Sequence, residues 1–170
     1  MGQQEVESFR HENNLPLQPS SSSAMTTIMN TDLARLLKAN QGFYTAFESM
    51  EMSAMSSVWA QRPEDCCIHP GWDILNGWLE IRESWRAIFA NTNFMRIELT
   101  ELSAEIIGTA GRVVCVENLF SVIERQTIHS RVASTNLFML MNGDWKLVLH
   151  QGSPIASQPV MVQEIDLDLN

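Results

Sequence analysis

The spacing of apolar residues changes once along this chain, near residue 95. Before that point, apolar side chains recur every three or four residues, which is typical of amphipathic helices. After it, apolar and polar side chains alternate, which is typical of strands with one buried face. Helices followed by strands predict an α+β fold, in which three N-terminal helices pack on one face of a curved, mainly antiparallel sheet.

Three helices are predicted in the first half of the chain. The first spans about 32–50 and carries a single apolar stripe. Ser53 can cap a short second helix. A short strand at 66–69 ends in a Pro-Gly turn, and a third helix follows Asn76-Gly77.

Four long strands are predicted in the second half. They span about 95–107, 112–123, 128–141 and 145–151. Asn142-Gly143 separates the last two and is among the strongest two-residue hairpin signals. A second two-residue turn is predicted at Arg125-Gln126, so that the strands form an antiparallel meander.

These turns decide which strand residues face the helices. With both turns in place, Glu117 lies opposite Ser134. Alternation then puts Glu117, Asn136 and Gln151 on the helix-covered face and His150 on the other. A one-residue slip in either turn would exchange some of these assignments.

The ends of the chain differ from its middle. Residues 1–31 are polar, with two prolines and a run of serines, and predict a flexible arm. Residues 155–170 form an acidic tail, and residues 32–154 are predicted to form one domain.

The charge balance and cysteine usage exclude several classes of partner. The chain has 20 acidic and 11 basic residues, which disfavours binding to nucleic acid or to an anionic membrane surface. No apolar run approaches the length needed to span a bilayer. The three cysteines, of which Cys66 and Cys67 are adjacent, do not indicate a disulfide framework. We therefore expect a cytoplasmic protein.

Both faces of the predicted sheet are substantially apolar. Three helices can cover only one of them, and a large exposed apolar patch usually marks association. We therefore expect a homodimer through the open sheet face. The alternative is that the tails of the chain fold over that face.

The helix-covered face mixes aromatic and polar side chains. Burying a carboxylate such as Glu117 without partners is expensive, so it pairs, takes up a proton or lines a hollow. An aromatic hollow with a few convergent polar groups is typical of a site for a small hydrophobic molecule. The predicted lining residues are Phe47, Trp59, Trp72, Trp85, Phe89, Asn136, Phe138 and Gln151.

Four strings resemble the SnoaL-like branch of the nuclear transport factor 2-like superfamily. They are Phe43-Tyr44-Thr45-Ala46-Phe47, Cys67-Ile68-His69-Pro70-Gly71-Trp72, Ser84-Trp85-Arg86-Ala87-Ile88-Phe89, and Asn136-Leu137-Phe138 leading to Gly143-Asp144-Trp145. The resemblance covers about 32–154. It implies a cone-shaped α+β fold, commonly dimeric, with a pocket between sheet and helices. The superfamily includes ketosteroid isomerase, polyketide cyclases and dehydratases, as well as members that only bind or assemble.

The resemblance also implies roles for three residues. In ketosteroid isomerase, a helix tyrosine stabilises the developing enolate, a carboxylate moves the proton, and a protonated sheet acid completes the oxyanion hole. Tyr44 matches the tyrosine, His69 before Pro70 falls near the base, and Glu117 matches the sheet acid more loosely. A histidine therefore replaces the usual carboxylate base.

Each of these candidate catalytic residues also has a structural interpretation. His69 can instead hold the turn that follows it, and the hydroxyl of Tyr44 can simply be satisfied by a strand. Glu117 can pair with one of the arginines, for which the candidates are Arg82, Arg86 and Arg131.

A metal site is not expected at the cysteine and histidine cluster. Because strand residues alternate, only Cys67 and His69 share a side, and two ligands make a poor zinc site.

Two functions fit this sequence. One is a cofactor-free isomerase, cyclase or dehydratase that acts on a small hydrophobic carbonyl compound by acid–base chemistry. The other is a non-catalytic ligand-binding or dimeric assembly module.

Overall fold

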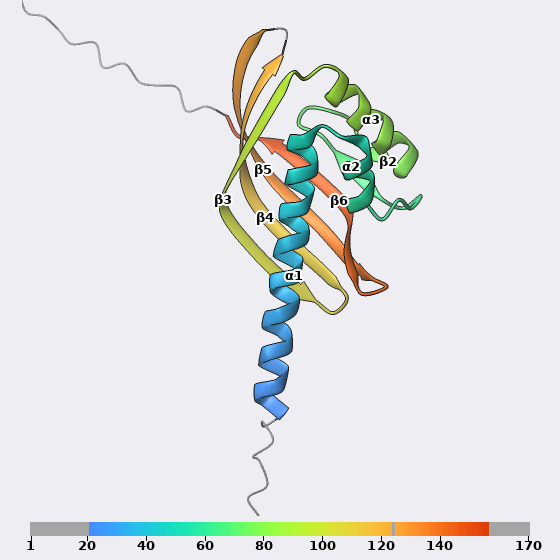
Figure 1. Ribbon diagram of the computed structural model, residues 1–170, viewed down its shortest axis with the longest axis vertical. Coiled ribbons are helices and arrows are strands. Elements are labelled where there is room, and N and C mark those ends of the chain that lie inside the picture. The colour runs from blue at the N-terminus through green and yellow to red at the C-terminus, as the bar shows by residue number, and fades with distance from the viewer. Residues whose placement is uncertain (1–20, 124, 157–170) are drawn as a thin grey trace, which may run out of the picture.

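A computed structural model describes residues 21–123 and 125–156. Within that part of the chain, three helices pack on one face of a curved six-stranded sheet (Figure 1). The α+β architecture predicted from the change in apolar spacing is confirmed. No helix in the described ranges is long and apolar enough to cross a membrane.

The longest helix crosses the sheet and extends past its edge. Helix α1 spans Ser21–Ser49, α2 spans Met52–Val58 and α3 spans Trp78–Ala90. The N-terminal part of α1 continues beyond the sheet (Figure 1). Residues 21–31, which were predicted as part of a flexible arm, are therefore helical. The rest of that arm, and the acidic tail from residue 157, lie outside the described residues.

The sheet has the strand order β2-β1-β6-β5-β4-β3. Its strands are β1 (Cys66–Ile68), β2 (Leu75–Asn76), β3 (Phe94–Ile107), β4 (Ala110–Ile123), β5 (Gln126–Met141) and β6 (Asp144–Pro154). The four long strands form the predicted antiparallel meander. Strand β1 pairs with β6 in parallel, so the chain returns from α2 to the far edge of the meander. This parallel pair and the two-residue strand β2 were not predicted.

The register between β4 and β5 differs from the prediction by two residues. Ile123 pairs with Gln126, so the turn lies one residue earlier than predicted. Glu117 consequently pairs with Val132 rather than with Ser134. Moving a two-residue turn by one residue shifts the pairing by two, and every side chain therefore keeps its predicted face.

The register between β5 and β6 contains a bulge that the prediction missed. The predicted Asn142-Gly143 turn is confirmed, but the pairing shifts by one residue between Leu137 and Phe138. An extra residue of this kind reverses the alternation beyond it. As a result His150 faces the helices, opposite Asn136, and the assignment of His150 to the open face is wrong.

Aromatic side chains fill the space between the helices and the sheet. Phe43 and Phe47 of α1 pack against Trp85 of α3, and Trp85 is fully buried. Because apolar residues recur on one stripe of each helix, both helices turn this aromatic layer toward the same sheet face. The layer surrounds the polar groups of the candidate site.

Candidate functional site

A cluster of buried polar groups is centred on the hydroxyl of Tyr44, on α1. That hydroxyl donates to Oε1 of Glu117 at 2.7 Å and accepts from Nδ2 of Asn136 at 3.0 Å. It also lies 3.0 Å from Oγ of Ser134 and 3.3 Å from Sγ of Cys115. A phenol has one proton to donate and two lone pairs. Its hydrogen-bonding capacity is therefore met by side chains of β4 and β5.

The side-chain amide of Asn136 extends the cluster to helix α1 and to strand β6. Nδ2 of Asn136 donates to Oδ1 of Asn40 at 2.8 Å, which links β5 to α1. Oδ1 of Asn136 lies 2.7 Å from Nδ1 of His150, which must be the donor because an amide oxygen only accepts. The amide of Asn136 thus connects the imidazole of His150 to the phenol of Tyr44.

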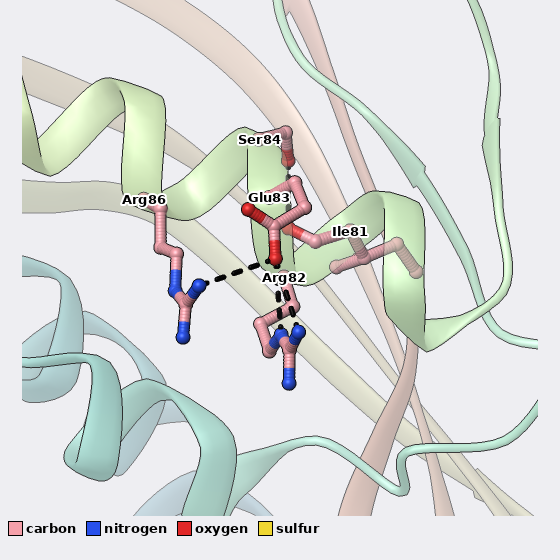
Figure 2. Close-up of polar contacts among 5 residues, drawn as sticks. All are labelled: Ile81, Arg82, Glu83, Ser84 and Arg86. Carbon is pink, nitrogen blue, oxygen red and sulfur yellow. Dashed lines mark hydrogen bonds and ion pairs between the residues drawn. The ribbon is translucent and has the colours of Figure 1, made fainter.

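His69 directly follows β1 and is held by α3. Its Nε2 lies 2.9 Å from Oγ of Ser84, whose own hydroxyl donates to the carbonyl of Ile81 at 2.8 Å. Ser84 and Ile81 lie one turn apart on α3 (Figure 2). Because the proton of Ser84 is used in this way, its oxygen accepts from Nε2–H of His69. Nδ1 of His69 therefore keeps its lone pair.

Two tryptophans hold the ring of His69 edge-on. The centroid of Trp85 lies 4.7 Å away, that of Trp72 lies 5.1 Å away, and that of His150 lies 6.4 Å away. His69 itself is buried, whereas Trp72 is 46% exposed. Trp72 therefore lies on the solvent side of the imidazole and Trp85 on the inner side.

Burial moves the pKa values of these groups in opposite directions. Desolvation, with a smaller contribution from His150, lowers the pKa of His69 to about 3, and desolvation lowers the pKa of His150 to about 4. Desolvation raises the pKa of Glu117, although hydrogen bonds from Tyr44 and Ser134 oppose the rise. Desolvation and the nearby Glu117 raise the pKa of Tyr44. At neutral pH both imidazoles are uncharged and the phenol keeps its proton.

Glu117 does not pair with any of the three arginines considered from the sequence. Arg82 and Arg86 both bind Glu83 on the outer side of α3, at 3.1 Å and 3.4 Å (Figure 2). Arg131 binds Glu101 at 3.6 Å. The arginine interpretation of Glu117 is wrong, and Tyr44 provides its hydrogen bond instead.

The predicted aromatic lining residues on the helices and in the loop after α2 lie in two separate places. Phe47 and Phe89 pack on Trp85, with ring centroids 4.8 Å and 5.8 Å away. Trp59 is buried elsewhere, against Trp78 at 6.2 Å.

The remaining two predicted lining residues lie on β5 and β6. Phe138 is buried opposite Leu147 and faces the helices. Gln151 is exposed on the open face of the sheet, because the bulge that precedes it in β6 reverses the alternation of all later residues of the strand. Its placement in the lining was wrong.

A pocket of about 530 Å³ lies where β6 ends, and its walls include neither the residues of the polar cluster nor the lining residues predicted from the sequence. Its walls include Pro70, Leu119 and Val132. Pro70 follows His69, and Val132 pairs with Glu117. A methyl group added at Gly152 would meet both Pro70 and Val132 at 3.0 Å, so these two side chains pack across that glycine. Both side chains line the pocket, whereas His69 and Glu117 do not.

Sequence reasoning did not name four members of the cluster as site residues, namely Asn40, Cys115, Ser134 and His150. Asn40 interrupts the apolar stripe of α1 one turn before Tyr44, and a polar residue in that position is a signal for a buried partner. Ser134 lies on the predicted inner face of β5 and could have been found by alternation. His150 gave no such signal, because its orientation depends on the bulge.

Comparison with known proteins identifies the family of this chain. A model of the SnoaL-like domain matches residues 36–157. The chain belongs to the SnoaL-like family. A candidate dehydratase of the nuclear transport factor 2-like family from Streptomyces avermitilis is 31% identical to it, with a TM-score of 0.71, and covers 75% of this chain and 99% of its own. The SnoaL-like resemblance is thereby confirmed.

More distant structures share the fold. A candidate calcium/calmodulin-dependent protein kinase type II association domain from Thiobacillus denitrificans is 28% identical, has a TM-score of 0.59, and covers 69% of this chain and 93% of its own. A ketosteroid isomerase-like protein from Erwinia carotovora atroseptica is 19% identical, has a TM-score of 0.61, and covers 75% and 99%. No curated protein matches the chain.

Replacing Tyr44 with phenylalanine tests the central role of its hydroxyl in this SnoaL-like domain. The change leaves Glu117 and Asn136 each short of one buried partner, so we expect Tyr44→Phe to lower the free energy of unfolding by about 1–3 kcal/mol. Thr45→Val removes a hydroxyl from the neighbouring, exposed position and should change stability by less than about 0.5 kcal/mol. Urea denaturation measures both, and equal effects would contradict the central role.

The lowered pKa values of the two buried histidines predict a pH-dependent stability. Below about pH 6.5 the unfolded chain binds protons at His69 and His150, whereas the folded state resists them until about pH 3 to 4. Stability should therefore fall as pH is lowered through this interval, by up to about 1.4 kcal/mol per pH unit for each histidine. The raised pKa of Glu117 acts in the opposite direction, because the folded state holds that proton more tightly.

Denaturation series at several pH values measure this slope. His150→Gln retains a donor toward Asn136 and should reduce the slope. His129→Gln, at an exposed ring, is the matched control and should leave it unchanged. An identical slope in His150→Gln and the parent protein would refute the assignment.

Proposed function

We propose that this SnoaL-like protein binds a small, mainly apolar carbonyl compound and catalyses cofactor-free proton transfer on it, as a dehydratase or isomerase does. The proposal rests on one observation. Two buried titratable groups, His69 and Glu117, have pKa values that are shifted in opposite directions. His69 is kept neutral and Glu117 is driven toward its protonated form. Titratable groups whose environments separate their pKa values are the usual base and acid of an active site.

The pocket at the end of β6 provides the binding site in this proposal. Its volume of about 530 Å³ is within the range for small-molecule sites. Pro70, Leu119, Val132 and Ile155 supply apolar walls, and Ser130 supplies a polar group. His69 and Glu117 are buried and do not line this pocket, so in this proposal a ligand reaches them only when the side chains that line the pocket move.

His69 is assigned the role of base. Its Nδ1 keeps a lone pair, since Nε2 is engaged with Ser84. A pKa of about 3 makes the imidazole a weak base in the closed site. Negative charge that develops on a bound substrate would raise this pKa, so the base strengthens as the proton is transferred.

Glu117 is assigned the role of acid, with Tyr44 as its partner. In a dehydration, Nδ1 of His69 removes a proton from the carbon beside the carbonyl, and the β-hydroxyl leaves as water with the proton of Glu117. The imidazolium proton then returns to the carboxylate through solvent, which restores both groups. In an isomerisation the carbonyl oxygen instead takes the hydrogen bond of the Glu117–Tyr44 pair. The 31% identity to a candidate dehydratase favours the first of these reactions.

The aldol product of benzaldehyde and acetone is a suitable probe, because its dehydration gives strongly absorbing benzylideneacetone. We expect the protein to accelerate this dehydration, and His69→Gln and Glu117→Gln each to reduce the rate roughly 100- to 10,000-fold. Glu98→Gln, at an exposed position on β3, is the matched control and should retain the parent rate. Parent-like rates in both site variants would refute the acid–base assignment.

We also propose that two copies associate through the sheet face that the helices leave open. Val114, Leu137 and Leu149 are half-buried there, beside Val116. Apolar side chains gathered on one open face favour burial against a second copy.

A charge placed in this apolar face tests the association. Leu137→Lys should convert a dimer into a monomer, whereas Leu79→Lys, at a 71% exposed position on α3, should not. Native mass spectrometry counts the subunits directly. A parent protein that is monomeric at micromolar concentration would refute the proposal.

A further inference from the structure

A second pocket, of about 390 Å³, lies at the opposite end of β6 from the candidate site. It is bounded by α1, by the end of α2 and by the start of β6. Both lysines of the chain, Lys38 and Lys146, line it together with Arg35. The chain as a whole is acidic, with 20 acidic and 11 basic residues, whereas this small pocket holds three basic side chains.

The three basic side chains differ in whether they have hydrogen-bond or ion-pair partners within the protein. Arg35 binds Asp32 at 3.1 Å and donates to the carbonyl of Gly143. Lys146 donates to the carbonyl of Ser57 at 2.7 Å. No acceptor for Lys38 lies among the residues that the structure describes. One carboxylate, that of Asp144, lines the pocket, so positive charge exceeds negative charge there.

Trp145 gives the pocket an aromatic wall and is 7% exposed. Its Nε1 is buried without a hydrogen-bond partner among the described residues, as are those of Trp59 and Trp85, which do not line this pocket.

The basic pocket continues into an apolar groove along α1. An adjoining pocket of about 460 Å³ shares Lys38, Gly42 and Val58 with the first and is further lined by Ala46 and Ala54. A methyl group added at Gly42 would have no heavy atom within 4 Å. The missing side chain at Gly42 therefore leaves the groove open between its basic and apolar parts.

We propose that this groove binds an organic monocarboxylate with an apolar chain. The carboxylate is held by Lys38 and Lys146, and the chain lies past Gly42 against the small side chains of α1 and α2. This site is distinct from the one proposed for carbonyl chemistry and does not depend on it. Charge-assisted hydrogen bonds fix the head, and burial of the chain adds affinity.

Because Trp145 lines the pocket, its indole resonance in a proton–nitrogen correlation spectrum reports whether the pocket is occupied. Titration with sodium octanoate should shift this resonance in a saturable manner. Octyl glucoside, which has the same chain and no charge, should leave it in place. An unmoved resonance at millimolar octanoate, or an equal shift with octyl glucoside, would overturn the proposal.

Two surface variants separate the head contact from the groove. Lys38→Met should weaken octanoate binding about tenfold, since a charged hydrogen bond contributes about 1.5–3 kcal/mol. Arg86→Met, on the outer side of α3, is its matched control and should bind as the parent does.

Gly42→Leu places a side chain in the groove at a position where a Cβ meets no heavy atom within 4 Å, and it favours the helix, so this variant should fold and lose binding. Undiminished binding in Gly42→Leu would overturn the groove assignment.

Discussion

The hydrogen bond between Tyr44 and Glu117 joins the helical layer to the sheet in the buried interior of the domain. Tyr44 is 1% exposed and Glu117 is 2% exposed, so neither group can be satisfied by solvent. Burying such groups is tolerable only when every donor and acceptor has a partner. This requirement fixes how α1 sits on β4 and β5, because Asn136 and Ser134 must reach the same phenol oxygen. Packing alone would allow the helix to slide or rotate.

The sequence was sufficient for the elements and for most of their orientation. Apolar spacing located three helices and four long strands, and Asn142-Gly143 fixed one hairpin. The pairing of β4 with β5 was wrong by two residues, yet Glu117 and Asn136 kept their predicted face. Side chains in a strand have a period of two, so an even error in register leaves each face unchanged. For this reason Glu117 and Asn136 could be assigned to the helix-covered face although their cross-strand partners were predicted wrongly.

Two features could not be predicted. One is a one-residue shift in the pairing of β5 with β6, and the other is the pairing of β1 with β6, which are distant in the sequence. A bulge between β5 and β6 puts His150 on the helix-covered face and Gln151 on the open face, the reverse of the prediction. No turn residue marks this bulge in the sequence. The parallel pairing of β1 with β6 brings His69 beside His150, although 80 residues separate the two in the chain. Local propensity carries little information about either feature, because both follow from how distant segments pack.

The same bulge explains how β6 can contribute to two sites. Trp145 and His150 are an odd number of residues apart, so a regular strand would direct them to opposite faces. The register shift restores both to the helix-covered side, where Trp145 lines the basic pocket and His150 contacts the polar cluster. One end of the strand thereby lies at the pocket proposed to bind a carboxylate, and the other supports neutral imidazoles. Among the described residues no cation pairs with Glu117, so desolvation raises its pKa and only the hydrogen bonds from Tyr44 and Ser134 oppose the rise.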